Sequence, residues 1–298
     1  MRAGYYRPMW HDSIAACLDE KGMPLAWHHR IVGQSIIAGT PFESAMVKDG
    51  IDDTSVEGAA NTPYGIPNLQ VELHSPKNAV TVLWWRSVGH SHTAFVMESM
   101  LDELAHAAGK DPYQYRRALL KKHPRTLNVL ETAAKKAGWD RPLPKGRGRG
   151  IAVHESFGSY IAQVAEVSVN HKGQIKVHRV VCAVDCGKIV NPDTIKAQME
   201  SGIIFGLSAV LYGAITLKNG RVEQGNFDSY PLVRMNATPR VEVHIVASNE
   251  EPGGVGEPGV PPIAPAVANA LFSLTGARVR SLPLTPDKVL TAMKVKQG

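Results

Sequence analysis

The stretch from Glu250 to Gly276 constrains the fold more than any other part of the sequence, because a loop rich in glycine and proline leads directly into an apolar segment. Glycines supply backbone freedom and prolines remove it, so such a loop can be rigid without being regular. The apolar run Ala266–Phe272 predicts a buried helix, with Pro265 in its first turn and Gly276 at its end. One carboxylate, Glu257, is therefore expected close to a packed helix. On composition alone, the alternative is a solvated glutamate in a surface turn.

The loop and two further segments resemble one family of enzymes. The string GGVGEPG (253–259), followed by PPIAPAVANALFSLTG, resembles the active-site loop of the molybdenum hydroxylases, the xanthine dehydrogenase and aldehyde oxidase family. Segments 84–120 and 180–213 resemble the same family, in particular the large subunit of the isoquinoline 1-oxidoreductase type. The three segments stand in family order along most of the chain.

The resemblance implies a role for several residues. Glu257 would be the catalytic base, and Gly256 beside it would belong to the cofactor-binding set. A turn that approaches molybdenum through backbone N–H groups would comprise Arg86, Ser87, Val88 and Gly89. Gln198 would contact the pterin, although an isolated glutamine in a helix is more often solvated.

The turn at Gly158 and Ser159 is a further candidate for cofactor binding. A glycine that interrupts a long strand pattern marks either a β-bulge or a close approach of another group to the backbone. The sequence alone favours the bulge, so cofactor contact at this turn is the second interpretation.

The pattern of elements predicts an α+β fold, with mixed sheets and packed helices. The segment PLPKGRGRG is the most plausible boundary, dividing a helix-rich part (1–140) from a C-terminal part (141–298) that carries the Glu257 loop. Long strands are predicted on both sides of the turn at 170–173, and a long helix follows Asn191. Residues 11–18 read as a short helix, 25–32 as a strand and 71–85 as a strand pair.

Gly202 and Gly206 share one face of the long helix that follows Asn191. A face without side chains allows close approach, either of another backbone or of a flat ligand. The sequence does not choose between them.

Composition excludes some functions. The net charge of +6 is modest, and the basic run Lys145–Arg149 has no aromatic interleaving, which argues against nucleic-acid binding. No apolar run is long enough for a membrane anchor, and the N-terminus lacks the apolar core of a signal peptide, so cytoplasm and periplasm both stay open. The three cysteines are expected to be buried free thiols, namely Cys17, Cys182 and Cys186. His90 and His92 fit capping or surface positions better than a metal site.

The resemblance implies the C-terminal portion of a catalytic large subunit. It would hydroxylate an N-heteroaromatic or aldehyde substrate with oxygen from water, using a molybdopterin cofactor, in particular the cytosine dinucleotide form. Electrons would pass to iron–sulfur clusters on a small partner subunit. A Gly-Gly-Phe-Gly loop typical of the family has no counterpart in residues 1–150, so the resemblance also implies a complementary N-terminal half as partner. The alternative is a catalytically silent scaffold that keeps the fold without the chemistry.

Overall fold

The computed structural model describes residue 2 and residues 4–295, and it divides the chain into two compact units. One unit is Ala3–His123, and the other is Pro124–Gly298 together with the first two residues. The α+β fold predicted from the sequence is confirmed, because both units combine helices with sheets. The division into 1–140 and 141–298 concerned the cofactor-binding parts and stays a prediction.

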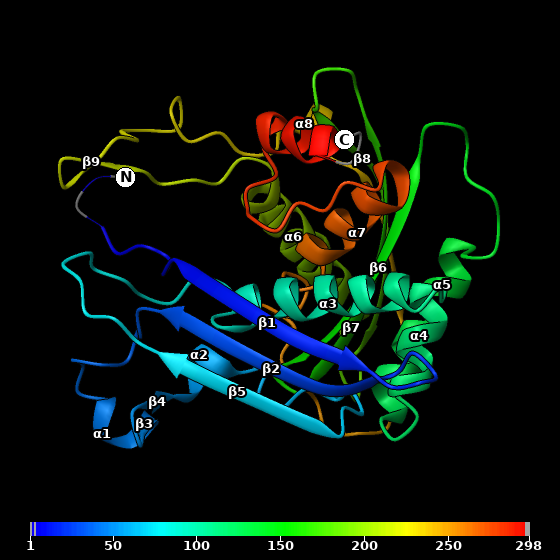
Figure 1. Ribbon diagram of the computed structural model, residues 1–298, viewed down its shortest axis with the longest axis horizontal. Helices are drawn as coiled ribbons and strands as arrows, with labels where there is room; N and C mark the ends of the chain where they lie inside the picture. The colour runs from blue at the N-terminus through cyan, green and yellow to red at the C-terminus, as the bar shows by residue number, and fades with distance from the viewer. Residues whose placement is uncertain (1, 3, 296–298) are drawn as a thin grey trace. The chain divides into compact units, whose positions relative to one another are not determined.

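The unit Ala3–His123 contains a three-stranded sheet in the order β1-β2-β5 (Figure 1). Its strands are β1 (Trp10–Leu18), β2 (Pro24–Gly33) and β5 (Asn68–His74). β1 pairs antiparallel with β2, and β5 pairs parallel with β2. The prediction of a helix at 11–18 is therefore wrong, because this segment forms the edge strand β1 with strict alternation of half-buried and exposed positions.

Short elements and two longer helices complete this unit. They are α1 (Glu43–Met46), β3 (Val47–Lys48), β4 (Ile51–Asp52), α2 (Asp53–Val56), α3 (His90–Ala107) and α4 (Pro112–Leu119). The carboxylate of Asp111 caps α4 by accepting from the Gln114 amide at 2.9 Å. The second strand predicted in 71–85 does not form. Beyond His74 this segment makes a single bridge, between Val82 and Tyr6.

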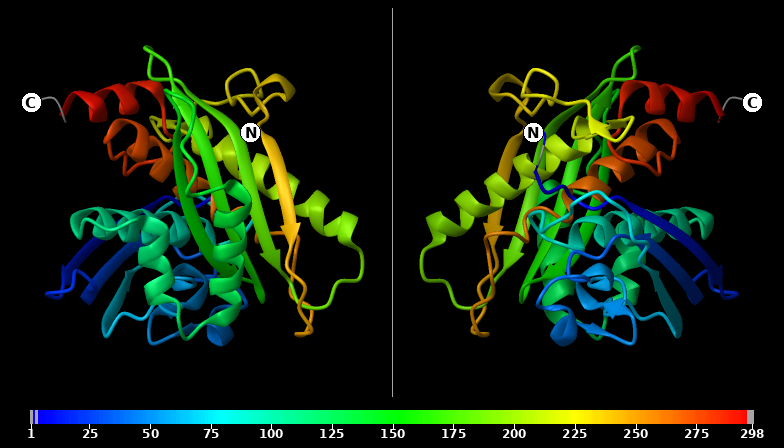
Figure 2. Two further views of the ribbon diagram at one scale, coloured as in Figure 1. Left: turned by 90° about the vertical axis from the view of Figure 1, so that its right-hand side faces the viewer. Right: turned by 90° about the vertical axis from the view of Figure 1, so that its left-hand side faces the viewer.

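The unit from Pro124 onward is built on a four-stranded sheet in the order β11-β8-β7-β6. Its strands are β6 (Gly148–Ser156), β7 (Ser159–Val169), β8 (Ile175–Asp185) and β11 (Arg240–Ile245). β6, β7 and β8 form an antiparallel meander, and β11 adds parallel to the outer edge of β8. Figure 2 shows these four strands side by side.

Helices cover both faces of the four-stranded sheet. They are α5 (Pro124–Ala137), α6 (Pro192–Leu211), α7 (Ile263–Thr275) and α8 (Pro286–Val295), and the smaller elements are β9 (Leu217–Lys218), β10 (Arg221–Val222) and the 3-10 turn Met235–Ala237. Residues paired across antiparallel strands point to the same face. The pairing of Gly150 with Ala165 and of Ala152 with Gln163 thus defines the face on which α7 lies. α5 packs on the opposite face, where Arg125 reaches Asp185.

Local sequence explains where these helices begin and end. The side chain of Asn191 accepts from the amides of Asp193 and Thr194, which fixes the start of α6 as predicted. Gly276 ends α7 in the left-handed conformation, with φ of 67°. Gly148 and Gly150 allow β6 to lie directly against the backbone of α7, since a methyl group at either position would collide with it.

Cys182 and Cys186 are buried free thiols, as predicted, whereas Cys17 is exposed on β1. The prediction for Cys17 fails because it depended on a helix at 11–18. Within the described part of the chain, no helix is long and apolar enough to cross a bilayer.

Candidate functional site

Glu257 lies in the connection between β11 and α7, in the unit that begins at Pro124. It is half-buried, and the next three residues are buried. The Val260 amide donates to the carbonyl oxygen of Glu257 at 3.0 Å, which closes a tight turn just before α7. A proline follows Glu257 in this turn and restricts its backbone further. The rigid but irregular loop predicted from the sequence is present.

The start of this loop is fixed by two neighbouring segments. The Gly253 amide donates to the Cys186 carbonyl at 2.9 Å, and the Gly254 amide donates to the Phe157 carbonyl at 2.7 Å. A side chain at Gly253 would collide with the backbone of Gly158. Close packing of two backbones explains why glycine occupies position 253.

Phe157 and Gly158 form the two-residue turn of the hairpin between β6 and β7. Both have positive φ, 54° and 72°, and Ser156 pairs with Ser159 across the turn. The β-bulge favoured by the sequence is therefore wrong, because the chain reverses completely at this point. The hydroxyl of Ser159 donates to the Gly254 carbonyl at 2.7 Å. The structure thus brings Gly158 and Ser159 directly against the Glu257 loop.

Helix α6 reaches the same loop from another direction. A β-carbon on Gly202 would lie 3.0 Å from the Cα of Gly259, and one on Gly206 would lie 2.7 Å from the Ile263 side chain. The glycine face of α6 therefore packs on the backbone that follows Glu257. The sequence left two interpretations of this face, close approach of another backbone or of a flat ligand. The structure shows the backbone. Gln198 is half-buried and lies one helical turn before Gly202.

The turn formed by Arg86, Ser87, Val88 and Gly89 lies in the other unit, immediately before α3. Ser87 and Val88 both have positive φ, 77° and 46°, which is strained for a β-branched valine. The Val88 amide donates to the Trp85 carbonyl at 2.7 Å, and the Gly89 amide donates to a Glu57 carboxylate oxygen at 2.8 Å. Two of the N–H groups expected to face a cofactor are thus engaged within the unit.

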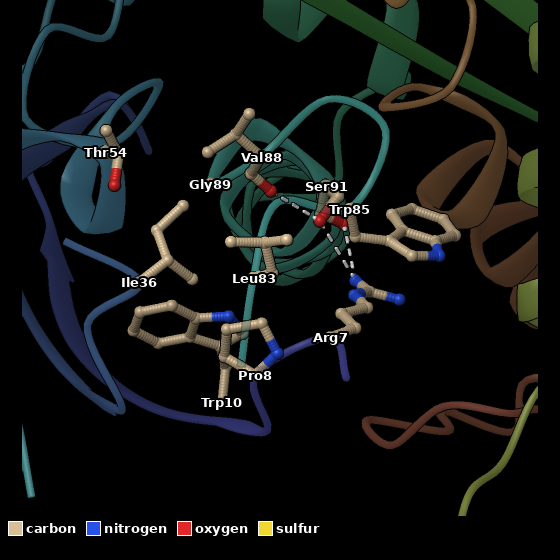
Figure 3. A pocket seen from close by; sticks show the side chains of 10 residues that line it. All are labelled: Arg7, Pro8, Trp10, Ile36, Thr54, Leu83, Trp85, Val88, Gly89 and Ser91. Carbon is tan, nitrogen blue, oxygen red and sulfur yellow. Dashed lines mark hydrogen bonds between the residues drawn. The ribbon is translucent and has the colours of Figure 1, made fainter. Parts of the chain in front are cut away.

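A small hollow lies beside this turn (Figure 3). Its apolar wall consists of Pro8, Trp10, Ile36, Leu83 and Trp85. Arg7 stacks on the Trp85 ring at 4.3 Å and donates to the hydroxyl of Ser91 at 3.2 Å. These contacts hold the segment before β1 against the start of α3.

His90 and His92 are buried in the first turn of α3, so of the two predicted alternatives, capping and surface positions, the surface position is wrong. Burial, with a smaller contribution from His92, lowers the pKa of His90 to about 4. The ring of His92 stacks on Trp10 with centroids 4.1 Å apart. Among the described residues, no group of three or more His, Cys, Asp or Glu side chains is placed to hold a metal.

The predicted site residues thus fall into two sets, one in each unit. Glu257, Gly256, Gly158 and Ser159 are brought together by the anchored loop, with Gln198 on the adjoining helix. The turn at 86–89 forms the second set.

Two side chains that fix the loop or its neighbours were not predicted from the sequence. Gln163 donates to the Gly259 carbonyl at 2.8 Å, and Asp185 accepts from the Gly187 amide at 3.0 Å. The available signal for Gln163 was a single amide within the otherwise apolar run 161–165 of β7.

Comparison with known proteins finds relatives along most of the chain. Two family models described as molybdopterin cofactor-binding domains match residues 16–120 and 92–239. The beta subunit of isoquinoline 1-oxidoreductase from Brevundimonas diminuta is 35% identical over 276 residues, covering 91% of this chain and 35% of that protein. A nicotinate dehydrogenase subunit from Pseudomonas putida is 33% identical, covering 78% of this chain and 21% of that protein.

Solved structures agree at the level of the fold. Quinoline 2-oxidoreductase from Pseudomonas putida 86 matches with a TM-score of 0.81 at 10% identity, over 97% of this chain and 62% of that chain. Aldehyde oxidoreductase from Desulfovibrio gigas matches with a TM-score of 0.77 at 16% identity, over 97% of this chain and 49% of that chain. The chain spans about a third or less of the length of the two curated relatives.

Proposed function

Because the chain belongs to the molybdopterin-binding, xanthine dehydrogenase and aldehyde oxidase family of molybdenum hydroxylases, we propose that it forms part of a catalytic subunit of this kind. The reaction would be hydroxylation of an N-heteroaromatic or aldehyde substrate with oxygen from water. Relatives named for isoquinoline, nicotinate and aldehyde oxidation support both substrate classes.

Glu257 is the residue that we propose as the base. A general base must be ionisable, reachable by substrate and held in place. Glu257 is half-buried on a loop whose start and end are bonded to a rigid sheet, at Gly254 and Gly259. This anchored, accessible carboxylate is the observation that carries the proposal. Its carboxylate oxygen would take up the proton released as the substrate carbon gains oxygen.

The residues around Glu257 fit a flat cofactor. Gly256 is exposed, and a β-carbon at this position would meet no other atom within 4 Å, so there is space for a planar group on the side of Gly256 where a side chain would lie. Gln198 offers both a donor and an acceptor, which suits the edge of a pterin ring. When bound, the molybdenum cofactor would supply the acceptor for the two electrons of the oxidation. Gly158 and Ser159 complete the proposed cofactor-binding set of this unit, and the turn at 86–89 is the proposed cofactor contact of the other unit.

Further components belong to the same proposal. The cofactor would be the cytosine dinucleotide form, and the partners would be a complementary part of the large subunit and a small iron–sulfur subunit. An iron–sulfur cluster usually takes four cysteine ligands, whereas this sequence contains three cysteines, two of them buried in or next to β8. The second candidate function is a silent scaffold, and the anchoring of Glu257 argues against it.

The test is Glu257→Gln in the complex assembled with the complementary part and the iron–sulfur subunit. Glutamine keeps the volume and hydrogen-bonding capacity but cannot accept the proton. We expect the cofactor content to be unchanged and the reduction of the complex by substrate to slow by ~10²–10⁴-fold. Stopped-flow absorbance of the iron–sulfur clusters measures this rate.

Two controls make the result decisive. Elemental analysis confirms that variant and wild-type complexes carry equal molybdenum, and Glu251→Gln removes an exposed carboxylate from the same loop. If Glu257→Gln reduces at the wild-type rate, Glu257 is not the base. If the loaded wild-type complex is reduced by neither an N-heteroaromatic nor an aldehyde, the scaffold interpretation is favoured.

A further inference from the structure

Two side chains on β7 hold the Glu257 loop on either side of the carboxylate. The Ser159 hydroxyl donates to the Gly254 carbonyl at 2.7 Å, and the Gln163 amide nitrogen donates to the Gly259 carbonyl at 2.8 Å. Both side chains are fully buried. Ser159 was a predicted cofactor contact, whereas Gln163 has no assigned role.

The geometry of β7 makes these two bonds a matched pair of anchors. Residues 159 and 163 are separated by an even number of positions, so their side chains leave the strand on the same face, about 13 Å apart. Glu257 lies between the two anchored carbonyls of Gly254 and Gly259. A loop fixed at both ends to one strand cannot slide along that strand, so the position of Glu257 is tied to the sheet.

Gly259 is also fixed on its other side by α6. A β-carbon on Gly202 would lie 3.0 Å from the Gly259 Cα, and one on Gly259 would lie 3.1 Å from the Met199 carbonyl oxygen. The backbone of Gly259 is therefore held between Gln163 on β7 and the glycine face of α6. Glu257 is only two residues away.

Stability alone does not explain a glutamine at position 163. The cross-strand neighbours of Gln163 are Ala152 and Cys182, neither of which carries a strong side-chain donor. Within the described part of the chain, its Oε1 atom is buried without a hydrogen-bond partner. An unsatisfied buried oxygen typically destabilises a fold by about 1–3 kcal/mol. An apolar side chain at position 163 would not leave a buried oxygen unsatisfied. The contribution of the glutamine is therefore its hydrogen bond to the Gly259 carbonyl.

We propose that Gln163 is the positioning residue for Glu257, which it holds through the Gly259 carbonyl. This role rests on the proposed function of Glu257 as base. It also makes a claim about the loop that is independent of the reaction, namely that the turn at 257–260 is ordered by Gln163.

The test uses Gln163→Met in the assembled complex. Methionine has similar length and volume but donates no hydrogen bond to Gly259. Hydrogen exchange reports the order of the loop through the Val260 amide, which donates to the Glu257 carbonyl in the intact turn. We expect this amide to exchange about tenfold faster in the variant. The rate of reduction by substrate should fall roughly 10–100-fold, since misplacement by about 1 Å can lower a rate by that amount, while molybdenum content stays constant.

Two further variants separate positioning from general packing. Gln163→Glu should keep nearly normal loop exchange and rate, because burial keeps the carboxyl protonated and its O–H can donate to Gly259. Asn269→Leu removes two different bonds, from the Asn269 amide to the Ile151 carbonyl at 3.3 Å and from the Arg278 guanidinium to the Asn269 side-chain oxygen at 2.8 Å. It should lower stability while the Val260 exchange and the rate per molybdenum remain within about twofold of wild type.

The outcomes distinguish the two claims. Unchanged Val260 exchange and an unchanged rate in Gln163→Met would overturn the positioning role. The positioning role would also be overturned if the Val260 amide lost as much exchange protection in Asn269→Leu as in Gln163→Met. Any change in the core would then loosen the loop equally. If Glu257→Gln reacts normally while Gln163→Met still loosens the loop, the anchor stands and the proposed base is wrong.

Discussion

At the residue scale, Asp185 supports the Glu257 loop from the opposite face of the sheet. The Arg125 guanidinium donates two bonds to the Asp185 carboxylate, at 2.8 and 2.7 Å, and the Gly187 amide donates a third at 3.0 Å. Just beyond, the Lys188 amide donates to the Glu250 carbonyl at 2.9 Å. The corner at 185–188 therefore fixes the residues that enter the loop. A buried carboxylate with three charge-assisted bonds is an unusually strong anchor.

This anchor predicts a defined pH dependence. Burial alone would raise the pKa of Asp185, but the bonds from Arg125 and Gly187 outweigh it, so the pKa is lowered. The stabilisation is then fully present above the ordinary carboxyl pKa of about 3.9 and is lost as the pH falls through the lower folded value. Asp185→Asn should destabilise this unit by about 1.5–3 kcal/mol at pH 7, as expected when the hydrogen bonds of a charged group are weakened beside the half-buried Arg125.

Urea unfolding of both proteins at pH 7 and pH 3 measures the difference. The gap in unfolding free energy should narrow at the lower pH, where the wild-type carboxyl approaches protonation. If wild type and Asp185→Asn differed in unfolding free energy by the same amount at both pH values, the ion pair would not be the cause of the difference. Glu200→Gln, at an exposed position of α6, is a suitable control for general charge effects.

Residues with special chemistry were predictable to different degrees. The glycines and prolines around Glu257 indicated an unusual backbone, but its role as base was predicted from the resemblance to the molybdenum hydroxylases. Gln163 and Asp185 did not stand out. Each lies in a segment that the surrounding apolar residues already predict as a strand, so neither residue was needed for that prediction. Their importance comes from carbonyl and amide groups that are distant in sequence, which periodicity does not reveal.

At the scale of elements, α6 packs closely on the start of α7 at Gly206. Gly206→Leu would force a side chain against Ile263 and Val260. Overpacking of this kind destabilises by typically ~1–3 kcal/mol. We expect the urea midpoint of the variant to fall accordingly. Ala197→Leu introduces the same side chain at an exposed position of α6 and should change stability by less than about 0.5 kcal/mol.

Equal midpoints for Gly206→Leu and wild type would contradict the observed packing. Loss of pterin with an unchanged midpoint would instead favour a ligand against this face of α6. The urea midpoint and the pterin content of Gly206→Leu therefore distinguish packing against a backbone from packing against a ligand.

Strand β1 shows why an element can be assigned wrongly. Its inward positions include Asp12, which is polar, and its outward positions include Ala15 and Cys17, which are apolar. The alternation that marks a strand is thus blurred in the sequence. Asp12 is tolerated inside because it is bonded to the buried His29 at 2.8 Å. A tertiary pairing therefore overrides the local pattern, while long uniform strands such as β8 were predicted correctly.

At the scale of the whole molecule, the chain corresponds to a limited part of its relatives. It covers 35% of the isoquinoline 1-oxidoreductase subunit and 21% of the nicotinate dehydrogenase subunit. The class of fold was predictable because hydrophobic periodicity is local. The order β11-β8-β7-β6 was not, because the pairing of β11 with β8 joins segments separated by all of α6.

The limited coverage leads to a prediction about the cofactor. The chain purified alone should contain little molybdenum, and co-expression with the complementary part of the large subunit should raise the content strongly. The reason is that a large cofactor is held by contacts from several segments, and a partial set binds weakly. Elemental analysis of the two preparations measures this. Stoichiometric molybdenum in the chain alone would show that its own residues suffice.

The late position of β11 in the chain has a consequence during protein synthesis. β8 emerges from the ribosome long before β11, and its outer edge carries the apolar run Val180–Val184. At about 5–20 residues per second, this edge stays unpaired for on the order of seconds in the nascent chain. An open, valine-rich edge is a template for wrong strand pairing. β11 closes the edge and leads directly into the Glu257 loop, so a single folding step both protects the nascent sheet and delivers the carboxylate.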